Sequence, residues 1–177
     1  PGGITTMNNT NKPWNKEKSS HNIDENYSRP NLPANHADHQ SYSGNELTKI
    51  LFLSKRGMSR SPLAREMMRT LLEGTQLFGR VRTSSRGVTE AYDQCPIDAR
   101  MSKFSTKLGY FLQGFSRFAT IPDLASADII ITLDHESEEF VNLHKSFIRG
   151  ISRPLGIFFS PGSDPYIQDP YERGEDE

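Results

Sequence analysis

The sequence has very little cysteine: Cys95 is the only one in 177 residues. A single cysteine cannot form a disulfide within the chain, and the lack of a disulfide framework is typical of a reducing compartment. Groups of cysteine and histidine with zinc-binding spacing are also missing, and the nearest approach is the pair His36 and His39 in a polar stretch. We therefore expect no metal, no cofactor and a cytoplasmic location. A role of the N-terminal region in a secreted effector stays open.

Long hydrophobic runs and an excess of charge of one sign are missing as well. No run approaches the roughly 18 apolar residues that a membrane-spanning helix needs, and no signal-peptide pattern opens the chain. The formal net charge is −1, which provides no basic surface for nucleic acid or for an anionic membrane. We expect neither of them as a partner.

The N-terminal quarter of the chain has few apolar residues. Residues 1–46 are rich in Asn, Ser, Lys, Glu, Pro and His, and such a segment cannot bury enough surface to offset its chain entropy. It is predicted to be a disordered tail, with residues 1–6 as a cloning remnant before Met7. An alternative is a docking or localisation segment anchored by Trp14. One folded domain is predicted for residues 47–177.

The most informative stretch is Lys49–Pro62, KILFLSKRGMSRSP. The short apolar run Ile50–Leu53 predicts a buried strand. Ser61 and Pro62 predict the start of an amphipathic helix, as its N-cap and first helical residue. The loop between them would direct backbone N–H groups, the positive end of the helix dipole and an arginine side chain at one point. This arrangement predicts a phosphate-binding loop.

Strands alternate with helices through the rest of the domain. Strands are predicted at Arg80–Gly87 and Ala127–Asp134, and an edge strand at Ile151–Phe159 is interrupted by Pro154. A helix is predicted to start near Pro96, with Asp98 in its first turn. Another helix is predicted at Glu136–Lys145, with Phe140, Leu143 and His144 as candidates for its inner side. This alternation favours an α/β fold, a parallel sheet of about four strands with helices on both faces. The phosphate loop would follow the first strand, at the carboxyl edge where such sheets bind ligands.

Several of these segments resemble one family. The loop ending Arg60-Ser61-Pro62 resembles that of the low-molecular-weight protein tyrosine phosphatases, as does the later Asp169-Pro170-Tyr171. The serine-rich end of the second strand, the Cys95–Arg100 stretch and the Ala127–Asp134 strand are similar too, in the same order over about residues 48–172.

The resemblance implies roles for individual residues. Position 54 would be the nucleophile, Arg60 would clamp the phosphoryl group, and Asp169 would protonate the leaving group. Ser61 and Ser85 would support the loop, and Tyr171 would form a wall against the substrate ring. Asp164, in an earlier copy of Asp-Pro-Tyr, is the alternative acid. The phosphate-binding loop would comprise Ser54, Lys55, Arg56, Gly57, Met58, Ser59, Arg60 and Ser61.

Ser54 departs from the family, which has cysteine at this position. A thiolate forms readily at a helix N-terminus, whereas a serine hydroxyl needs an adjacent base to become a nucleophile. We therefore expect phosphate binding to survive and turnover nearly to vanish. Two interpretations remain: a replacement that traps the substrate of an active phosphatase, or a natural pseudophosphatase that binds phosphoprotein without turnover.

The resemblance also favours a phosphotyrosine-containing protein as the substrate, because Met58 stands where family members acting on phosphoarginine carry threonine. Lys55 and Arg56 favour acidic sequences around the phosphate. After Tyr171 the family has a further C-terminal helix, which is missing before Glu177. Two explanations stay open: the sequence is cut short at Glu177, or the sheet face that this helix covers is left bare and meets a partner or a second copy.

Overall fold

The computed structural model describes residues 47–171, so the predicted tail at residues 1–46 lies outside the described part. Within residues 47–171 no helix is both long enough and apolar enough to cross a membrane.

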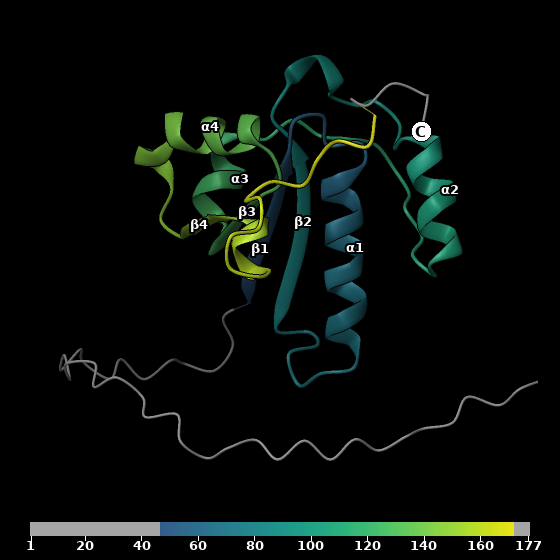
Figure 1. The fold of residues 1–177 in the computed structure, drawn as a ribbon. Coiled ribbons are helices and arrows are strands. Elements are labelled where there is room, and N and C mark those ends of the chain that lie inside the picture. The colour runs from purple at the N-terminus through teal and green to yellow at the C-terminus, as the bar shows by residue number, and fades with distance from the viewer. Residues whose placement is uncertain (1–46, 172–177) are drawn as a thin grey trace, which may run out of the picture. The chain divides into compact units, whose positions relative to one another are not determined.

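The centre of the domain is a four-stranded sheet (Figure 1). Its strands are β1 (Thr48–Ser54), β2 (Val81–Gly87), β3 (Ile129–Thr132) and β4 (Ile151–Pro154). They lie in the order β2-β1-β3-β4, and every neighbouring pair is parallel. The predicted parallel α/β sheet is confirmed.

Helices lie on both faces of this sheet (Figure 1). They are α1 (Arg60–Glu73), α2 (Ala99–Lys107), α3 (Ile121–Ser126) and α4 (His135–Leu143), with short 3₁₀ turns at Glu90–Tyr92, Lys145–Phe147 and Leu155–Phe158. Helix α1 covers one face, α3 and α4 cover the other, and α2 stands beside α1. Helix α3 was not predicted, since it is short. Its start is marked by the Thr120–Asp123 capping box and by a proline in its first turn.

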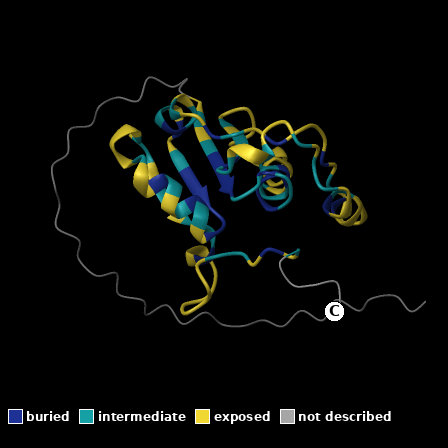
Figure 2. Ribbon diagram, turned by 90° about the horizontal axis from the view of Figure 1, so that it is seen from above, coloured by how far each residue is buried: buried dark blue, intermediate teal, exposed yellow. Residues whose placement is uncertain are grey.

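Strand β1 is buried on both faces, which explains its uninterrupted apolar sequence. Leu51 and Leu53 pack in the core on the α3 and α4 side. Phe52 points to the other side, where it joins Ile131 and the α1 residue Ala64. Figure 2 shows these strands as the buried centre between more exposed helices. The carboxyl end of β1 is therefore held rigidly, and the loop that follows it starts from a fixed point.

Two predicted helix starts were wrong. Helix α1 begins at Arg60 with Ser59 as N-cap, so Pro62 is the third helical residue rather than the first. A proline fits there because the first-turn N–H groups have no partner within the helix. Helix α2 begins after Asp98, which is the N-cap and accepts hydrogen bonds from the Arg100 and Met101 amides. Pro96 lies outside the helix, bridged to Phe115.

The last two predicted elements were too long at their ends. Strand β4 stops at Pro154 and the chain turns into the Leu155–Phe158 3₁₀ turn. Gly156 fixes this turn, because a Cβ there would lie 2.0 Å from the Asp164 carbonyl oxygen. Helix α4 ends at Leu143, whose side chain is 75% exposed instead of facing inward.

Candidate active site

The β1–α1 loop (residues 54–60) lies at the carboxyl edge of the sheet and packs against the end of β2. Gly57 has φ +69°, and a Cβ on it would lie 2.5 Å from the Gly87 nitrogen. A Cβ on Gly87 would lie 2.7 Å from the Arg56 carbonyl oxygen. The Val88 and Thr89 amides donate to loop carbonyls at 3.0–3.1 Å. The loop conformation therefore depends on two glycines that allow its backbone to touch the end of β2.

Ser54 lies at the base of this loop and is 2% exposed. Its Oγ is 2.8 Å from Ser61 Oγ and accepts from the Gly57 amide at 3.3 Å. Ser61 Oγ also donates to the Arg86 carbonyl oxygen at 3.3 Å. The Ser61 side chain thus links Ser54 to β2.

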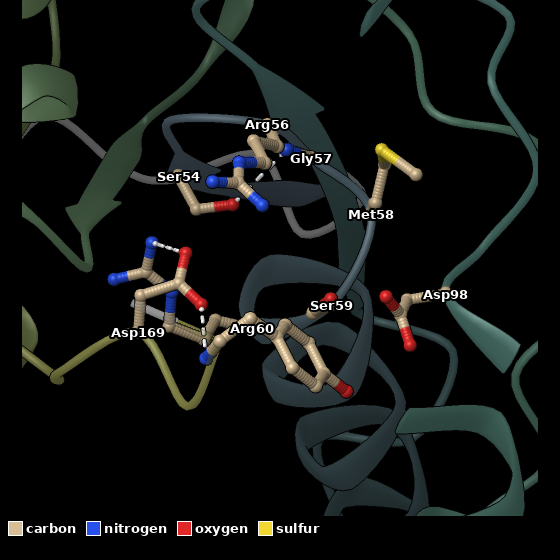
Figure 3. Close-up of a pocket in the computed structure, with 9 residues that line it drawn as sticks. Ser54, Arg56, Gly57, Met58, Ser59, Arg60, Asp98 and Asp169 are labelled. Carbon is tan, nitrogen blue, oxygen red and sulfur yellow. Dashed lines mark hydrogen bonds and ion pairs between the residues drawn. The ribbon is translucent and has the colours of Figure 1, made fainter. Parts of the chain in front are cut away.

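Arg60 is buried between two carboxylates. Its Nη2 is 2.8 Å from Asp134 Oδ2 and 3.0 Å from Asp169 Oδ2, and all three side chains are less than a tenth exposed. Its Nη1 donates to the Ile167 carbonyl oxygen at 2.6 Å. Figure 3 shows the pairing of Arg60 with Asp169, which comes from the C-terminal segment. The first helical residue of α1 is therefore tied to a residue more than a hundred positions later.

A single pocket brings most of the predicted residues together (Figure 3). Its lining consists of Ser54, Arg56, Gly57, Met58, Ser59, Arg60, Asp98, Asp169 and Tyr171. Asp164 is not among them: it is exposed and accepts from the Tyr166 amide at 2.9 Å. Ser85 lies behind the loop on β2, and the hydrogen bond from Ser61 reaches the carbonyl of its neighbour Arg86.

Tyr171 forms one wall, and its surroundings are polar. The guanidinium carbon of Arg100 lies 3.7 Å from the centre of the Tyr171 ring. Burial and the nearby Asp98 carboxylate raise the pKa of Tyr171. Burial acts to raise the pKa of Asp98, but hydrogen bonds from the Met101 and Arg100 amides, the Arg100 side chain and the Tyr171 hydroxyl lower it overall. This wall of the pocket therefore carries a carboxylate that is ionised at neutral pH.

Four residues around the pocket were not predicted from the sequence. Asp134 accepts from the Lys55 amide at 2.8 Å besides pairing with Arg60, and it caps α4. Asp98 lines the pocket, Glu136 pairs with the Lys55 side chain at 2.7 Å, and the Tyr92 ring lies 5.5 Å from the Arg56 guanidinium carbon. Lys55 lowers the pKa of Glu136. Asp134 could have been found, since it follows a parallel strand at the edge where ligands bind.

A metal is not indicated by the described side chains. Residues 47–171 contain no group of three or more His, Cys, Asp or Glu residues placed to hold a metal ion. The two buried carboxylates, Asp134 and Asp169, are neutralised by Arg60 instead.

A parallel sheet with a tight loop after its first strand, a buried arginine at the start of the next helix and an Asp-Pro-Tyr segment beside it defines a phosphatase domain of the α/β class. The sequence matches the family model of low molecular weight phosphotyrosine protein phosphatases over residues 49–177, and the chain belongs to this family. The resemblance drawn from its motifs is confirmed. A search of curated protein sequences finds no significant match.

Solved structures share the fold at low sequence identity. A protein tyrosine phosphatase from Entamoeba histolytica is 21% identical with a TM-score of 0.64, covering 70% of this chain and 80% of that one. A Drosophila arginine phosphatase is 22% identical with a TM-score of 0.63, covering 72% and 83%. The Bacillus subtilis arginine phosphatase YwlE, as a cysteine-to-serine mutant with a phosphorylated active-site serine, is 20% identical with a TM-score of 0.59, covering 70% and 79%.

Proposed function

We propose that this chain is a protein tyrosine phosphatase-type domain that binds phosphotyrosine-containing proteins, with residue 54 in the position of the nucleophile. The observation that carries this proposal is the arrangement of Ser54, Arg60 and Asp169 in one pocket at the N-terminus of α1. Loop N–H groups, the helix dipole and a guanidinium fork all favour a phosphoryl group there. Tyr171 and Met58 supply apolar surface for a phenol ring.

The reaction divides into two steps. A nucleophile at position 54 attacks phosphorus, the bond from phosphorus to the phenol oxygen breaks, and the electron pair leaves with that oxygen. Asp169 delivers a proton to the oxygen, so tyrosine departs neutral. Water then attacks the phosphorus of the phosphoryl-enzyme and gives a proton to Asp169. The bond from phosphorus to residue 54 breaks, its electron pair returns to residue 54, and inorganic phosphate leaves. Arg60 must turn from Asp169 towards the phosphoryl group for this to occur, which frees the carboxyl for proton transfer.

Ser54 sets the rate of the first step. Its hydrogen-bond partners are the Ser61 hydroxyl and the Gly57 amide, and neither can act as a base. A hydroxyl without a base is a weak nucleophile, so the chain with Ser54 is expected to bind phosphoprotein with little or no turnover. The phosphorylated active-site serine of the YwlE cysteine-to-serine mutant supports the view that a serine at this position can still accept a phosphoryl group.

A natural pseudophosphatase is the second candidate function, favoured by the unusual loop. Lys55 and Arg56 accompany Ser54 in this chain, and Lys55 is bound to Glu136 on α4. A loop adapted to binding would keep its phosphate affinity and lack the geometry for transfer, even with cysteine at position 54.

The experiment that tests the proposal is para-nitrophenyl phosphate turnover by the full chain and by Ser54→Cys, with phosphate binding measured on both by calorimetry. We expect phosphate binding in both and turnover in Ser54→Cys. A further change of Asp169→Ala or Arg60→Lys in the Ser54→Cys background should reduce that turnover. If Ser54→Cys binds phosphate and stays inert, the chain is a binding protein. If neither form binds phosphate, the proposed function is wrong.

We also propose that the domain acts in the cytoplasm and associates over an apolar face. Ile50, Ile129 and Ile151 are aligned across β1, β3 and β4, on the side of the sheet that carries α1. Ile50 and Ile129 are partly buried, and Ile151 is 57% exposed. An apolar row on a sheet normally packs against another element, so this edge favours a second copy or another protein as its cover.

A further inference from the structure

Arg56 differs from the other cations of the β1–α1 loop in having no carboxylate partner. Lys55 is paired with Glu136, and Arg60 is paired with both Asp134 and Asp169. Among residues 47–171 no carboxylate forms an ion pair with Arg56, and its Nε is buried without a hydrogen-bond partner. A buried donor left unpaired is unfavourable, so its retention requires a reason.

The Arg56 side chain faces the reaction pocket. It lines the same cavity as Ser54, Ser59 and Arg60 (Figure 3). On its other side the guanidinium carbon lies 5.5 Å from the centre of the Tyr92 ring. An aromatic face within about 6 Å attracts a guanidinium without using its N–H donors. Tyr92 can therefore hold the group in place while its donors stay available to an anion.

The charge around the two arginines is unequal. Two carboxylates share Arg60, so an incoming phosphate must compete with Asp134 and Asp169 for it. Nothing among the described carboxylates competes with phosphate for Arg56. A positive charge in a partly buried site attracts an anion strongly. Arg56 should therefore attract phosphate more strongly than Arg60, whose charge is offset by two carboxylates, while the pocket is empty.

We propose that Arg56 is a specificity-determining residue of this site: it binds the phosphoryl oxygens directly and, together with Arg60, selects a dianionic phosphomonoester over a monoanionic ester of the same shape. This inference rests on the proposed function. A phosphate monoester carries nearly two negative charges at neutral pH, since its second pKa is near 6. Two guanidinium forks match that charge and its three oxygens, whereas a sulfate ester offers a single charge.

The test compares phosphotyrosine with sulfotyrosine, which have the same shape and differ in charge. Affinities of both are measured by calorimetry at pH 7.5 for the full chain, Arg56→Gln and Arg56→Lys. Arg82→Gln serves as the matched control, because Arg82 lies exposed on β2 outside the pocket. We expect Arg56→Gln to weaken phosphotyrosine binding about 10- to 100-fold, the effect of losing a charge-assisted hydrogen bond. Sulfotyrosine binding should weaken much less, so the preference between the two ligands narrows.

The remaining outcomes separate this inference from the proposed function. Arg56→Lys keeps the charge but loses the fork and should recover only part of the affinity. If the full chain binds phosphotyrosine and Arg56→Gln binds it equally well, the inference is overturned while the proposed function stands. If the full chain binds neither ligand, both fail. Thermal unfolding checks that each variant is folded. Should Arg56→Gln not fold, Arg56→Met, which also lacks the charge, replaces it: an unchanged ratio of phosphotyrosine to sulfotyrosine affinity overturns the inference, and a several-fold smaller ratio supports it.

Discussion

At the scale of single residues, the Arg60 guanidinium is bound by carboxylates that compete with the phosphoryl group for it. Asp169 is the proposed acid, yet in this structure it is bound to the guanidinium that the phosphoryl group needs. The same carboxylate would therefore oppose binding and assist the chemical step. These two effects have opposite signs and can be measured separately.

Asp169→Asn is expected to tighten phosphate binding and to slow turnover. Removing the negative charge frees one Nη2 contact of Arg60, so the phosphate affinity of the Ser54 chain should rise severalfold. In the Ser54→Cys background, loss of the acid should lower the rate by about 10² to 10⁴. Calorimetry with phosphate and turnover of an unactivated aryl phosphate measure the two effects. Asp164→Asn separates the two Asp-Pro-Tyr copies: equal losses of rate in both variants would contradict the role given to Asp169.

At the scale of elements, helix α2 depends on one carboxylate. Asp98 accepts from the Arg100 amide at 2.8 Å and from the Met101 amide at 3.2 Å, and it also lines the pocket. The position of the pocket wall and the stability of α2 are therefore connected through the same side chain.

Asp98→Ala is expected to cost about 1 kcal/mol of unfolding free energy at pH 7, the usual value for loss of an N-cap. The pKa of Asp98 is lower in the folded chain than its ordinary value, so its stabilisation is fully present above that ordinary value, near 3.9. It is lost as the pH falls through the folded-state pKa. Urea unfolding at a series of pH values measures this. The difference in unfolding free energy between the unsubstituted chain and Asp98→Ala should become smaller only at acid pH. A difference that is constant with pH would contradict the role of the Asp98 carboxylate as the N-cap of α2.

Sequence periodicity predicted the elements better than their ends. The apolar run of β1 and the alternation of strands and helices were sufficient for the sheet, because burial on two faces leaves a clear pattern. Helix starts were less predictable, since a serine can cap a helix or bind elsewhere. Ser61 binds Ser54, and Ser59 stands at the N-cap position without a side-chain capping hydrogen bond. The loop and Asp169 could be predicted from motifs. Asp134 could not be assigned to Arg60, because their contact depends on the packing of β1 beside β3.

At the scale of the whole molecule, the two faces of the sheet are covered unequally. On the α3 and α4 side, Leu124 and Ile130 are completely buried. On the α1 side, Ile50 and Ile129 are partly buried, and Ile151 at the β4 edge is exposed. Nearby in the chain, Phe158 of the 3₁₀ turn is 62% exposed.

Ile151→Lys is expected to weaken self-association of the chain, because a charge would have to be buried in the contact. Sedimentation velocity over a range of protein concentrations measures this, with Leu143→Lys as the control. Leu143 is more exposed, at 75%, but belongs to α4 on the opposite side of the sheet. If the chain stays monomeric at every concentration, a second copy does not cover this apolar face. Another protein is then the remaining candidate partner. Equal effects of the two substitutions would argue against this face.

The contact between Gly57 and Gly87 has a consequence for protein engineering. Because each glycine leaves room for the backbone around the other, the β1–α1 loop and the end of β2 form one transferable unit, although about thirty residues separate them in the chain. If the seven-residue loop alone were grafted into another scaffold, its backbone would clash with a Cβ at the position that Gly87 occupies in this protein. A library that varies the loop for new anion specificities should therefore keep both glycines fixed and place its diversity at positions 55, 56, 58 and 59.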